Sequence, residues 1–203
     1  MMLRGRYFSL KTRLYYSLIF SVLFLYSCST DPKDLLENQN DLSEEYYEFQ
    51  GFDLSEYEIP ATIMFPDETA NIGASTKPEV LHTEDNFYWD IIVGPNFQMH
   101  IEDYGDNTNL VAEHKKSLKE RDMFAINYLI NEKDLVMYER KLIVKGQKKA
   151  PKTVGIEHKS FHVYGQKTVD GITYELRSRD EGYEKVIIEL MTKSIRSFEK
   201  KNT

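Results

Sequence analysis

Cysteine is almost absent from this chain, and long apolar runs are absent altogether. Cys28 is the only cysteine among 203 residues, which excludes an intrachain disulfide framework and a cysteine-based zinc site. The longest apolar stretch, residues 14–26, is shorter than the roughly 20 residues that a membrane-spanning helix needs. The sequence also contains no glycine-rich phosphate loop, nucleophile elbow or HExxH motif. No common catalytic motif therefore indicates an enzyme.

Positive charge is scarce outside the first residues. The chain has a formal net charge of −7, with 26 basic and 33 acidic residues. Four of the basic residues (Arg4, Arg6, Lys11 and Arg13) precede residue 28, so residues 28–203 carry 22 basic against 33 acidic residues, a net charge of −11. A body this acidic repels phosphate backbones, and we expect no nucleic-acid partner.

The first 28 residues follow the order of a bacterial secretory signal: a basic segment, an apolar stretch and a small residue. Leu25, Tyr26, Ser27 and Cys28 resemble the lipobox read by the lipoprotein signal peptidase, in which an aliphatic, a variable and a small residue precede the cysteine. Tyr26 is bulkier than the usual residue at the variable position. The resemblance implies cleavage before Cys28, a diacylglyceryl thioether on its sulfur and a third acyl chain on the new amino terminus.

Three other interpretations of this segment are an uncleaved signal anchor, a secretory signal cleaved without lipid, and a buried structural cysteine. Lipidation is favoured because the single cysteine falls where the lipobox requires it. Two or three acyl chains, at about 0.8 kcal/mol per buried methylene, hold a protein on a bilayer essentially permanently. We therefore expect residues 1–27 to be a lipoprotein signal peptide, and the mature chain to have a membrane as its partner through lipid on Cys28.

Residues 28–50 are acidic and poor in apolar side chains, so they predict a flexible tether after the lipidated cysteine. Asp31, Asp34 and Glu37 loosely resemble the acidic tags that some Gram-negative lineages use to send lipoproteins to the cell surface, although a solvated linker also explains them. We expect the cell envelope of a Gram-negative bacterium, with the outer membrane preferred and either leaflet open. Residues 51–203 remain for a single domain, because the chain is too short for two well-formed cores.

The domain alternates strand and helix patterns. Alternating apolar residues and turn signals predict strands, and Asp170-Gly171 is the clearest hairpin signal. Apolar residues three and four apart predict two helices, of which the second has the clearer amphipathic stripe. This stripe consists of Tyr183, Val186, Ile187, Leu190, Met191, Ile195 and Phe198, with Ser194 on the same face. The expected strands are 57–65, 87–94, 97–104, 124–131, 135–144, 156–169 and 172–179, and the expected helices are 109–122 and 182–200.

Short connections between consecutive strands imply antiparallel pairing. The expected fold class is α+β, with an antiparallel sheet of about 6–8 strands flanked by a central helix and a C-terminal amphipathic helix. Phe65-Pro66 at a strand end and the segment from Met191 to Phe198 resemble the PsbP-like α/β/α sandwich, a family of binding and assembly factors more often than enzymes. A cystatin-like or other curved-sheet fold is the alternative.

Few residues suggest a site. His100 and Glu102 share one predicted strand face, where they could do acid–base work if a pocket formed around them, and with Trp89 they are the candidate ligand face. A core or core-rim position for Trp89 and a solvated face for the other two are the favoured explanations. His158 and His162 lie about 13 Å apart on a strand, too far to share a metal ion. The turn residues Asp103 to Asn109 lack the spacing of a calcium loop, and His114 is expected at the edge of the core. We expect no cofactor and no metal, and we assign no catalytic residue.

Function is therefore predicted only as a class. The leading interpretation is a membrane-anchored envelope lipoprotein whose domain binds a protein partner or a ligand without catalysis. The second is a structural or assembly subunit of an envelope complex, using an exposed sheet edge or the tyrosine-rich segment 45–49. The third is a hydrolase with a non-standard site.

Overall fold

The computed structural model describes residues 48–75, 77–83, 86–143 and 159–201. The helical elements of this part are α3 (Leu110–Glu120), α4 (Lys185–Ser197) and two single 3-10 turns, η2 (Ser55–Tyr57) and η3 (Glu68–Ala70). Its strands are β1 (Phe49–Asp53), β2 (Ala61–Pro66), β3 (Glu79–Leu81), β4 (Tyr88–Ile92), β5 (Gln98–Asp103), β6 (Phe124–Asn131), β7 (Leu135–Leu142), β8 (Lys159–Val169), β9 (Ile172–Ser178) and β10 (Glu199–Lys200).

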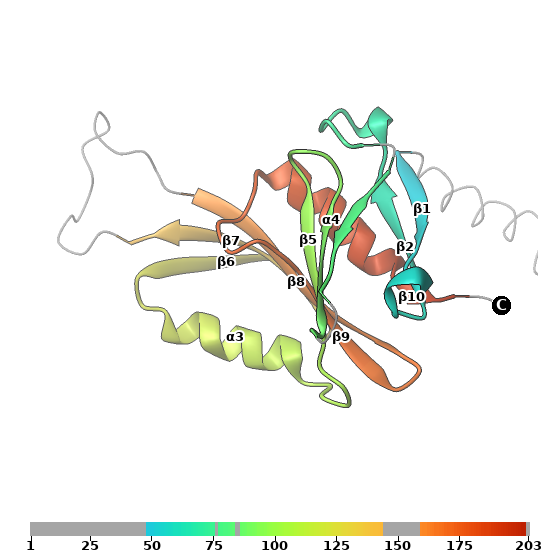
Figure 1. The fold of residues 1–203 in the computed structure, drawn as a ribbon. Helices are drawn as coiled ribbons and strands as arrows, with labels where there is room; N and C mark the ends of the chain where they lie inside the picture. The colour runs from blue at the N-terminus through green and yellow to red at the C-terminus, as the bar shows by residue number, and fades with distance from the viewer. Residues whose placement is uncertain (1–47, 76, 84–85, 144–158, 202–203) are drawn as a thin grey trace, which may run out of the picture. The chain divides into compact units, whose positions relative to one another are not determined.

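Seven strands form one antiparallel sheet in the order β3-β4-β5-β9-β8-β7-β6 (Figure 1). β1, β2 and β10 form a second, three-stranded antiparallel sheet. The described part of the chain thus has an antiparallel sheet of the expected size, a central helix and a C-terminal helix. The expected α+β class is confirmed.

The β8–β9 hairpin shows why the turn signal was reliable. Asp170 and Gly171 both have positive φ, at 52° and 86°. Two successive left-handed residues give the turn whose twist matches paired strands, and glycine reaches that conformation without strain. Val169 and Ile172 consequently lie directly opposite each other, and this register sets which β8 and β9 side chains share a face.

α4 is buried on two sides. Its stripe packs on the inner face of β8 and β9, as the amphipathic pattern predicts. β2 covers a second flank, and the Ser197 hydroxyl accepts a hydrogen bond of 2.8 Å from the Met64 amide. Ile188 and Thr192, which lie outside the predicted stripe, are therefore buried. Val186, which the stripe includes, is 51% exposed.

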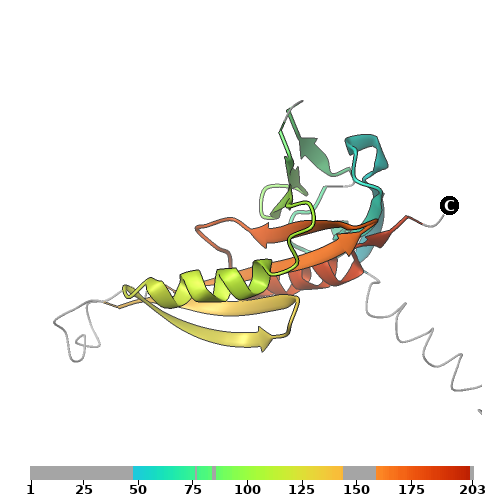
Figure 2. The ribbon, with the colours of Figure 1, turned by 90° about the horizontal axis from the view of Figure 1, so that it is seen from below.

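α3 lies on the opposite face of the large sheet and closes a second, smaller core (Figure 2). Alternation along β7 separates the two cores: Leu135 and Met137 belong to the α4 side, whereas Val136 and Tyr138 belong to the α3 side. This helix covers the sheet only near β6, β7 and β8 (Figure 1). The same face of β4, β5 and β9 continues beyond it and carries polar side chains.

The start of the domain differs from the sequence prediction. β1 begins at Phe49, whose side chain is buried, so the predicted tether overlaps the first two residues of this strand. The strand predicted for residues 57–65 begins only at Ala61, because residues 55–57 form η2 and Pro60 directly precedes β2. β2 is the middle strand of the small sheet, between β1 and β10.

Candidate functional site

The predicted ligand face does not lie on one side of the sheet. In the β4–β5 pair Trp89 is opposite Ile101, and Asp90 is opposite His100. Because side chains alternate along a strand, Trp89 points into the core, with 4% of its surface exposed, whereas His100 and Glu102 point to the other face. The structure brings His100 and Glu102 together and places Trp89 elsewhere.

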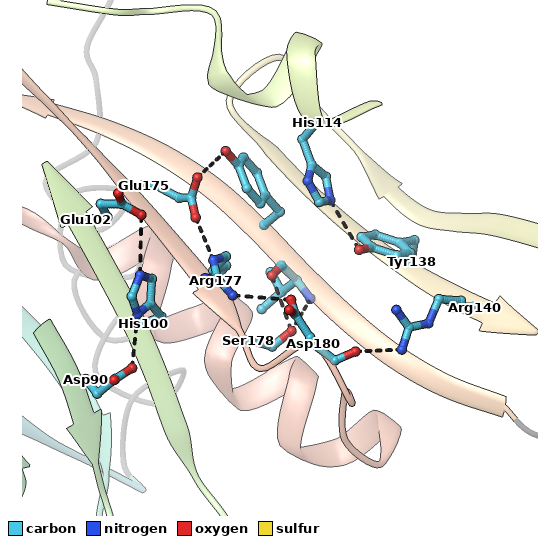
Figure 3. A network of polar contacts seen from close by, with 12 residues as sticks. Asp90, His100, Glu102, His114, Tyr138, Arg140, Glu175, Arg177, Ser178 and Asp180 are labelled. Atoms are coloured by element: carbon cyan, nitrogen blue, oxygen red, sulfur yellow. Dashed lines mark hydrogen bonds and ion pairs between the residues drawn. The ribbon is translucent and has the colours of Figure 1, made fainter. Parts of the chain in front are cut away.

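His100 lies between two carboxylates on the face that continues beyond α3 (Figure 3). Its Nδ1 is 3.0 Å from Asp90 Oδ1, and its Nε2 is 3.5 Å from Glu102 Oε2. The ring of Tyr88 stacks on the imidazole at 5.6 Å between centroids. Burial and the charges of Glu175 and Glu102 raise the pKa of nearby Tyr104 to about 12. This side of the network is acidic and partly solvated.

Other predicted residues cannot be placed. Leu25, Tyr26, Ser27 and Cys28 lie outside the described residues, and so does His158. Lipid attachment therefore stays a prediction. Within the described ranges, no group of three His, Cys, Asp or Glu side chains could hold a metal ion.

A pocket of about 310 Å³ lies between α3, the floor formed by β7, β8 and β9, and the loop that follows β9. Its lining includes three tyrosines, two histidines, four arginines and three carboxylates. A concave site with convergent polar groups and perturbed pKa values is the usual signature of a binding or catalytic site. This pocket is therefore the candidate functional site.

A larger hollow of about 540 Å³ lies beside the start of α3 and the β6–β7 turn. The buried side-chain amide of Gln166 lines this hollow and already has hydrogen-bond partners. Gln166 Nε2 donates to the Thr108 carbonyl at 2.7 Å and to Asp134 Oδ1 at 3.3 Å, and its Oε1 accepts from the Val111 amide at 3.0 Å. These bonds tie the first turn of α3 to the sheet and replace the missing intrahelical partners there. The buried polar side chain of this hollow therefore has a structural role.

Four stacked rings form the floor of the 310 Å³ pocket. His114 of α3 stacks on Tyr164 of β8, with centroids 3.9 Å apart and an interplanar angle of 10°. Tyr138 of β7 stacks on His162 of β8 at 5.2 Å and 16°. The His114 Nε2 and the Tyr138 hydroxyl are 3.1 Å apart and join the two stacks (Figure 3). The His114–Tyr164 stack and the His114–Tyr138 contact hold α3 to the sheet, and the Tyr138–His162 stack joins β7 to β8.

Both histidines are neutral at physiological pH. Burial lowers the pKa of His162 to about 4, and the charge of Arg140 acts in the same direction. Burial also lowers the pKa of His114 to about 4, with the charges of Arg121 and Arg177 adding to the effect. Burial raises the pKa of Tyr138 to about 12. The stack is therefore an uncharged, hydrogen-bonding surface surrounded by guanidinium groups.

A buried carboxylate links the stack to the polar network on β9. Glu175 is 5% exposed, and its Oε2 accepts a hydrogen bond of 2.5 Å from the Tyr164 hydroxyl. Its Oε1 accepts from Arg177 Nε at 2.7 Å. Both oxygens thus have strong donors, which compensates much of the cost of burying a charge. Burial and this carboxylate together raise the pKa of Tyr164 far above its ordinary value.

The guanidinium groups reach the pocket from different elements. Arg177 Nη1 is 3.4 Å from Asp180 Oδ1, and Arg140 Nη2 donates to the Asp180 carbonyl at 2.6 Å (Figure 3). Arg179 lies 4.5 Å over the ring of Tyr183. Arg121, one residue beyond the end of α3, completes the set. These four arginines come together in a chain whose net charge is −7.

His162 also has a hydrogen-bonding partner that resembles a nucleophile. The Ser160 hydroxyl is 2.8 Å from its Nε2, and a backbone hydrogen bond with Arg179 raises the pKa of the imidazole against the effect of burial. Gly182 packs against the ring so closely that a Cβ there would come within 2.6 Å of His162 Cε1. A general base works best with a pKa near the working pH, and this imidazole is far below it. The pair is better explained as a structural hydrogen bond.

Sequence reasoning missed this cluster because its members are far apart in the chain. The sequence indicates His114 only as a residue at the edge of the core, and the strand spacing argues against His162 as a metal ligand. One signal could have indicated the floor: Tyr138, His162 and Tyr164 point to the same face of neighbouring strands. Recognising this requires the β7–β8 register. That register was not predictable across residues 145–155.

Comparison with known proteins identifies no relative. No family model matches the chain, and neither the curated proteins nor the solved structures include a significant match. Among the described residues, no helix is long and apolar enough to cross a membrane.

Proposed function

We propose that this chain is a lipoprotein of the cell envelope, attached to a membrane through lipid on Cys28, and that its domain binds a small molecule in the pocket beside α3 without catalysing a reaction. The observation that carries the binding proposal is the pocket of about 310 Å³ in which a neutral histidine–tyrosine stack meets several guanidinium groups. A small-molecule site typically has this shape and a few placed polar groups.

Binding is favoured over catalysis because the polar groups of the pocket are paired with one another. Glu175 is saturated by Tyr164 and Arg177, and the imidazoles of His114 and His162 titrate near pH 4. Neither imidazole is poised to take or give a proton near neutrality. Their arrangement favours recognition of a ligand through fixed donors.

The anchor part of the proposal is supported by sequence. The basic segment, the apolar stretch of residues 14–26 and the lipobox resemblance at Leu25, Ser27 and Cys28 support it. A Gram-negative outer membrane is the proposed location, and the PsbP-like resemblance remains a prediction about the family of the domain.

An assembly role is the second candidate, and one observation favours it. Large apolar side chains are exposed near both edges of the seven-stranded sheet. Phe87 is 70% exposed beside β4, and Met123 is 53% exposed just before β6. Exposed apolar side chains at unpaired strand edges are common at protein–protein contacts. Loss of a complex when Phe87 or Met123 is replaced by serine would favour this candidate.

The binding proposal is tested by filling the pocket. The full-length chain, purified from membranes in mild detergent, is equilibrated with a small-molecule extract of the cell envelope, washed and denatured, and the released compounds are identified by mass spectrometry. Ser117 of α3 lines the pocket, whereas Ala112 of the same helix is exposed outside it. We expect a compound to be released by the wild type and by Ala112→Trp, but not by Ser117→Trp. Equal recovery from both variants, or none from the wild type, contradicts the proposal.

A further inference from the structure

The pocket gathers positive charge that the chain as a whole lacks. Its lining holds four arginines against three carboxylates, whereas the chain carries 26 basic and 33 acidic residues. One of the three carboxylates, Glu175, is buried and accepts from the Tyr164 hydroxyl and from Arg177, so the charges of Glu175 and Arg177 are paired with each other. The two neutral histidines add no charge of either sign. Outside the Arg177–Glu175 pair, the lining holds three arginines against two carboxylates, Glu113 and Asp180, so guanidinium groups are in excess.

Several donors of these guanidinium groups remain for a ligand. The described hydrogen bonds of Arg177 use Nε and Nη1, and that of Arg140 uses Nη2. The guanidinium of Arg121 has no hydrogen-bond partner in the described part of the chain, although it lines the pocket. A guanidinium carries five N–H donors in a planar fork that matches carboxylate and phosphate oxygens. The pocket thus offers guanidinium N–H donors from the residue after α3, from β7 and from β9.

Asp180 shows that oxygen acceptors fit between Arg140 and Arg177. Its carboxylate lies 3.4 Å from Arg177, and its backbone carbonyl accepts a bond from Arg140, so two oxygens of one residue bridge the two arginines. The Asp180 side chain is 91% exposed, which means that the bridge lies at the solvent rim of the pocket. An exposed ion pair of this kind contributes little to stability, so it can be exchanged for another anion at small cost.

We propose that the ligand of this pocket carries an anionic oxygen group, a carboxylate or a phosphate, and that Arg121, Arg140 and Arg177 bind it in competition with the carboxylate of Asp180. This inference rests on the proposed function and names the chemical class of the ligand. The pocket of about 310 Å³ has room for a ligand larger than the anionic group itself.

The electrostatic environment of the histidines supports the same class. Burial is the main cause of the lowered pKa of both histidines; the charges of Arg121 and Arg177 add to the effect on His114 and that of Arg140 to the effect on His162, while Asp180 acts in the opposite direction. These three guanidinium groups therefore act on the interior of the pocket from three elements. A bound anion offsets their charge, and we expect it to raise the pKa of His114, which nuclear magnetic resonance of the imidazole protons can follow.

The test uses inorganic phosphate and acetate as probes, titrated calorimetrically into the full-length chain in detergent at pH 7.5. Chloride keeps the ionic strength constant, so that general screening is not mistaken for binding. We expect Arg121→Gln to weaken binding of the preferred probe at least tenfold, because a charge-assisted donor is lost. Lys116→Gln makes the same charge change on an exposed position of α3 outside the pocket and should leave binding unchanged. The stronger of the two probes identifies the anionic group as phosphate or carboxylate.

Asp180→Asn provides a test in the opposite direction. It removes the competing charge while keeping the size of an exposed side chain, so we expect binding at least threefold tighter than in the wild type. No binding of either probe by the wild type, or equal binding by Arg121→Gln and the wild type, overturns the inference. If that happens while Ser117→Trp still abolishes recovery of a compound, the ligand is uncharged and the proposed function stands. If Ser117→Trp changes nothing, the proposed function itself fails.

Discussion

Protonation of His162 should lower the stability of the domain in a pH range where an exposed histidine would have no effect. This side chain is 3% exposed, stacked on Tyr138, and within hydrogen-bond distance of Ser160. Its pKa is about 4 in the folded chain and 6.5 when unperturbed. The unfolded state therefore binds more protons than the folded state between pH 6.5 and pH 4, and stability falls as the pH is lowered through that range.

The magnitude follows from the two pKa values. Between pH 7.5 and pH 5, the unfolded imidazole becomes almost fully protonated while the folded one stays mostly neutral. The resulting loss in the free energy of unfolding is about 2 kcal/mol for His162 alone. The groups around the imidazole are Arg140 of β7 and Arg179 and Asp180 after β9, and burial outweighs the single carboxylate among them. His114, whose pKa is also about 4, acts in the same direction.

The assay is urea denaturation of the full-length chain in detergent at pH 7.5 and pH 5, followed by the fluorescence of Trp89, the only tryptophan and a core residue. His162→Phe keeps a ring against Tyr138 but cannot be protonated. The absolute stability of this variant can differ from that of the wild type. The compared quantity is therefore the loss in the free energy of unfolding between pH 7.5 and pH 5 in each protein. We expect the variant to lose about 2 kcal/mol less than the wild type. Equal losses would refute the assignment of His162 as a buried neutral group.

Three further predictions concern packing, backbone and anchor. Leu190→Ala should lower the free energy of unfolding by about 2–5 kcal/mol and Val186→Ala by less than about 0.5 kcal/mol, because their exposures are 6% and 51%; similar values in urea melts would contradict the docking of α4. Gly182→Ala should cost more than Gly171→Ala in the same melts, since both have positive φ but only Gly182 has atoms within 4 Å of a new Cβ, and the reverse order would rule out the close packing on the pocket floor. Cys28→Ala should abolish incorporation of radiolabelled fatty acid, and persistent label would show that lipid is attached elsewhere.

Local pattern was sufficient for most of the secondary structure. β6 has the predicted bounds, and β4, β5, β7 and β9 fall within the predicted ranges, because strand alternation and turn residues are encoded within a few positions. The two predicted helices were correct in position, with ends that moved inward by one to three residues. β1, β3 and β10 were missed because short strands carry too little alternation to be distinguished from loops.

Burial of a side chain depends on which other elements pack on its helix or strand. Sequence periodicity does not reveal those neighbours. The pattern of α4 predicted one buried stripe, but β2 covers a second flank, so Ile188 is buried and Val186 is not. Likewise, His100 and Trp89 are eleven residues apart on paired strands, and the β4–β5 register places them on opposite faces. A shift of one residue in that register would have brought them together.

The fold class, the hairpin at Asp170-Gly171 and the prediction of a lipid anchor rest on residues close together in the chain, where steric preference and the signal pattern act directly. The pocket has a different origin. His114, Tyr138, His162 and Arg177 come from one helix and three strands, and they meet because antiparallel pairing places β9 beside β8 and β8 beside β7 while α3 folds back over that half of the sheet. Long-range packing sets both their proximity and their burial, and burial is the main reason that the two imidazoles are neutral beside the arginines of the pocket.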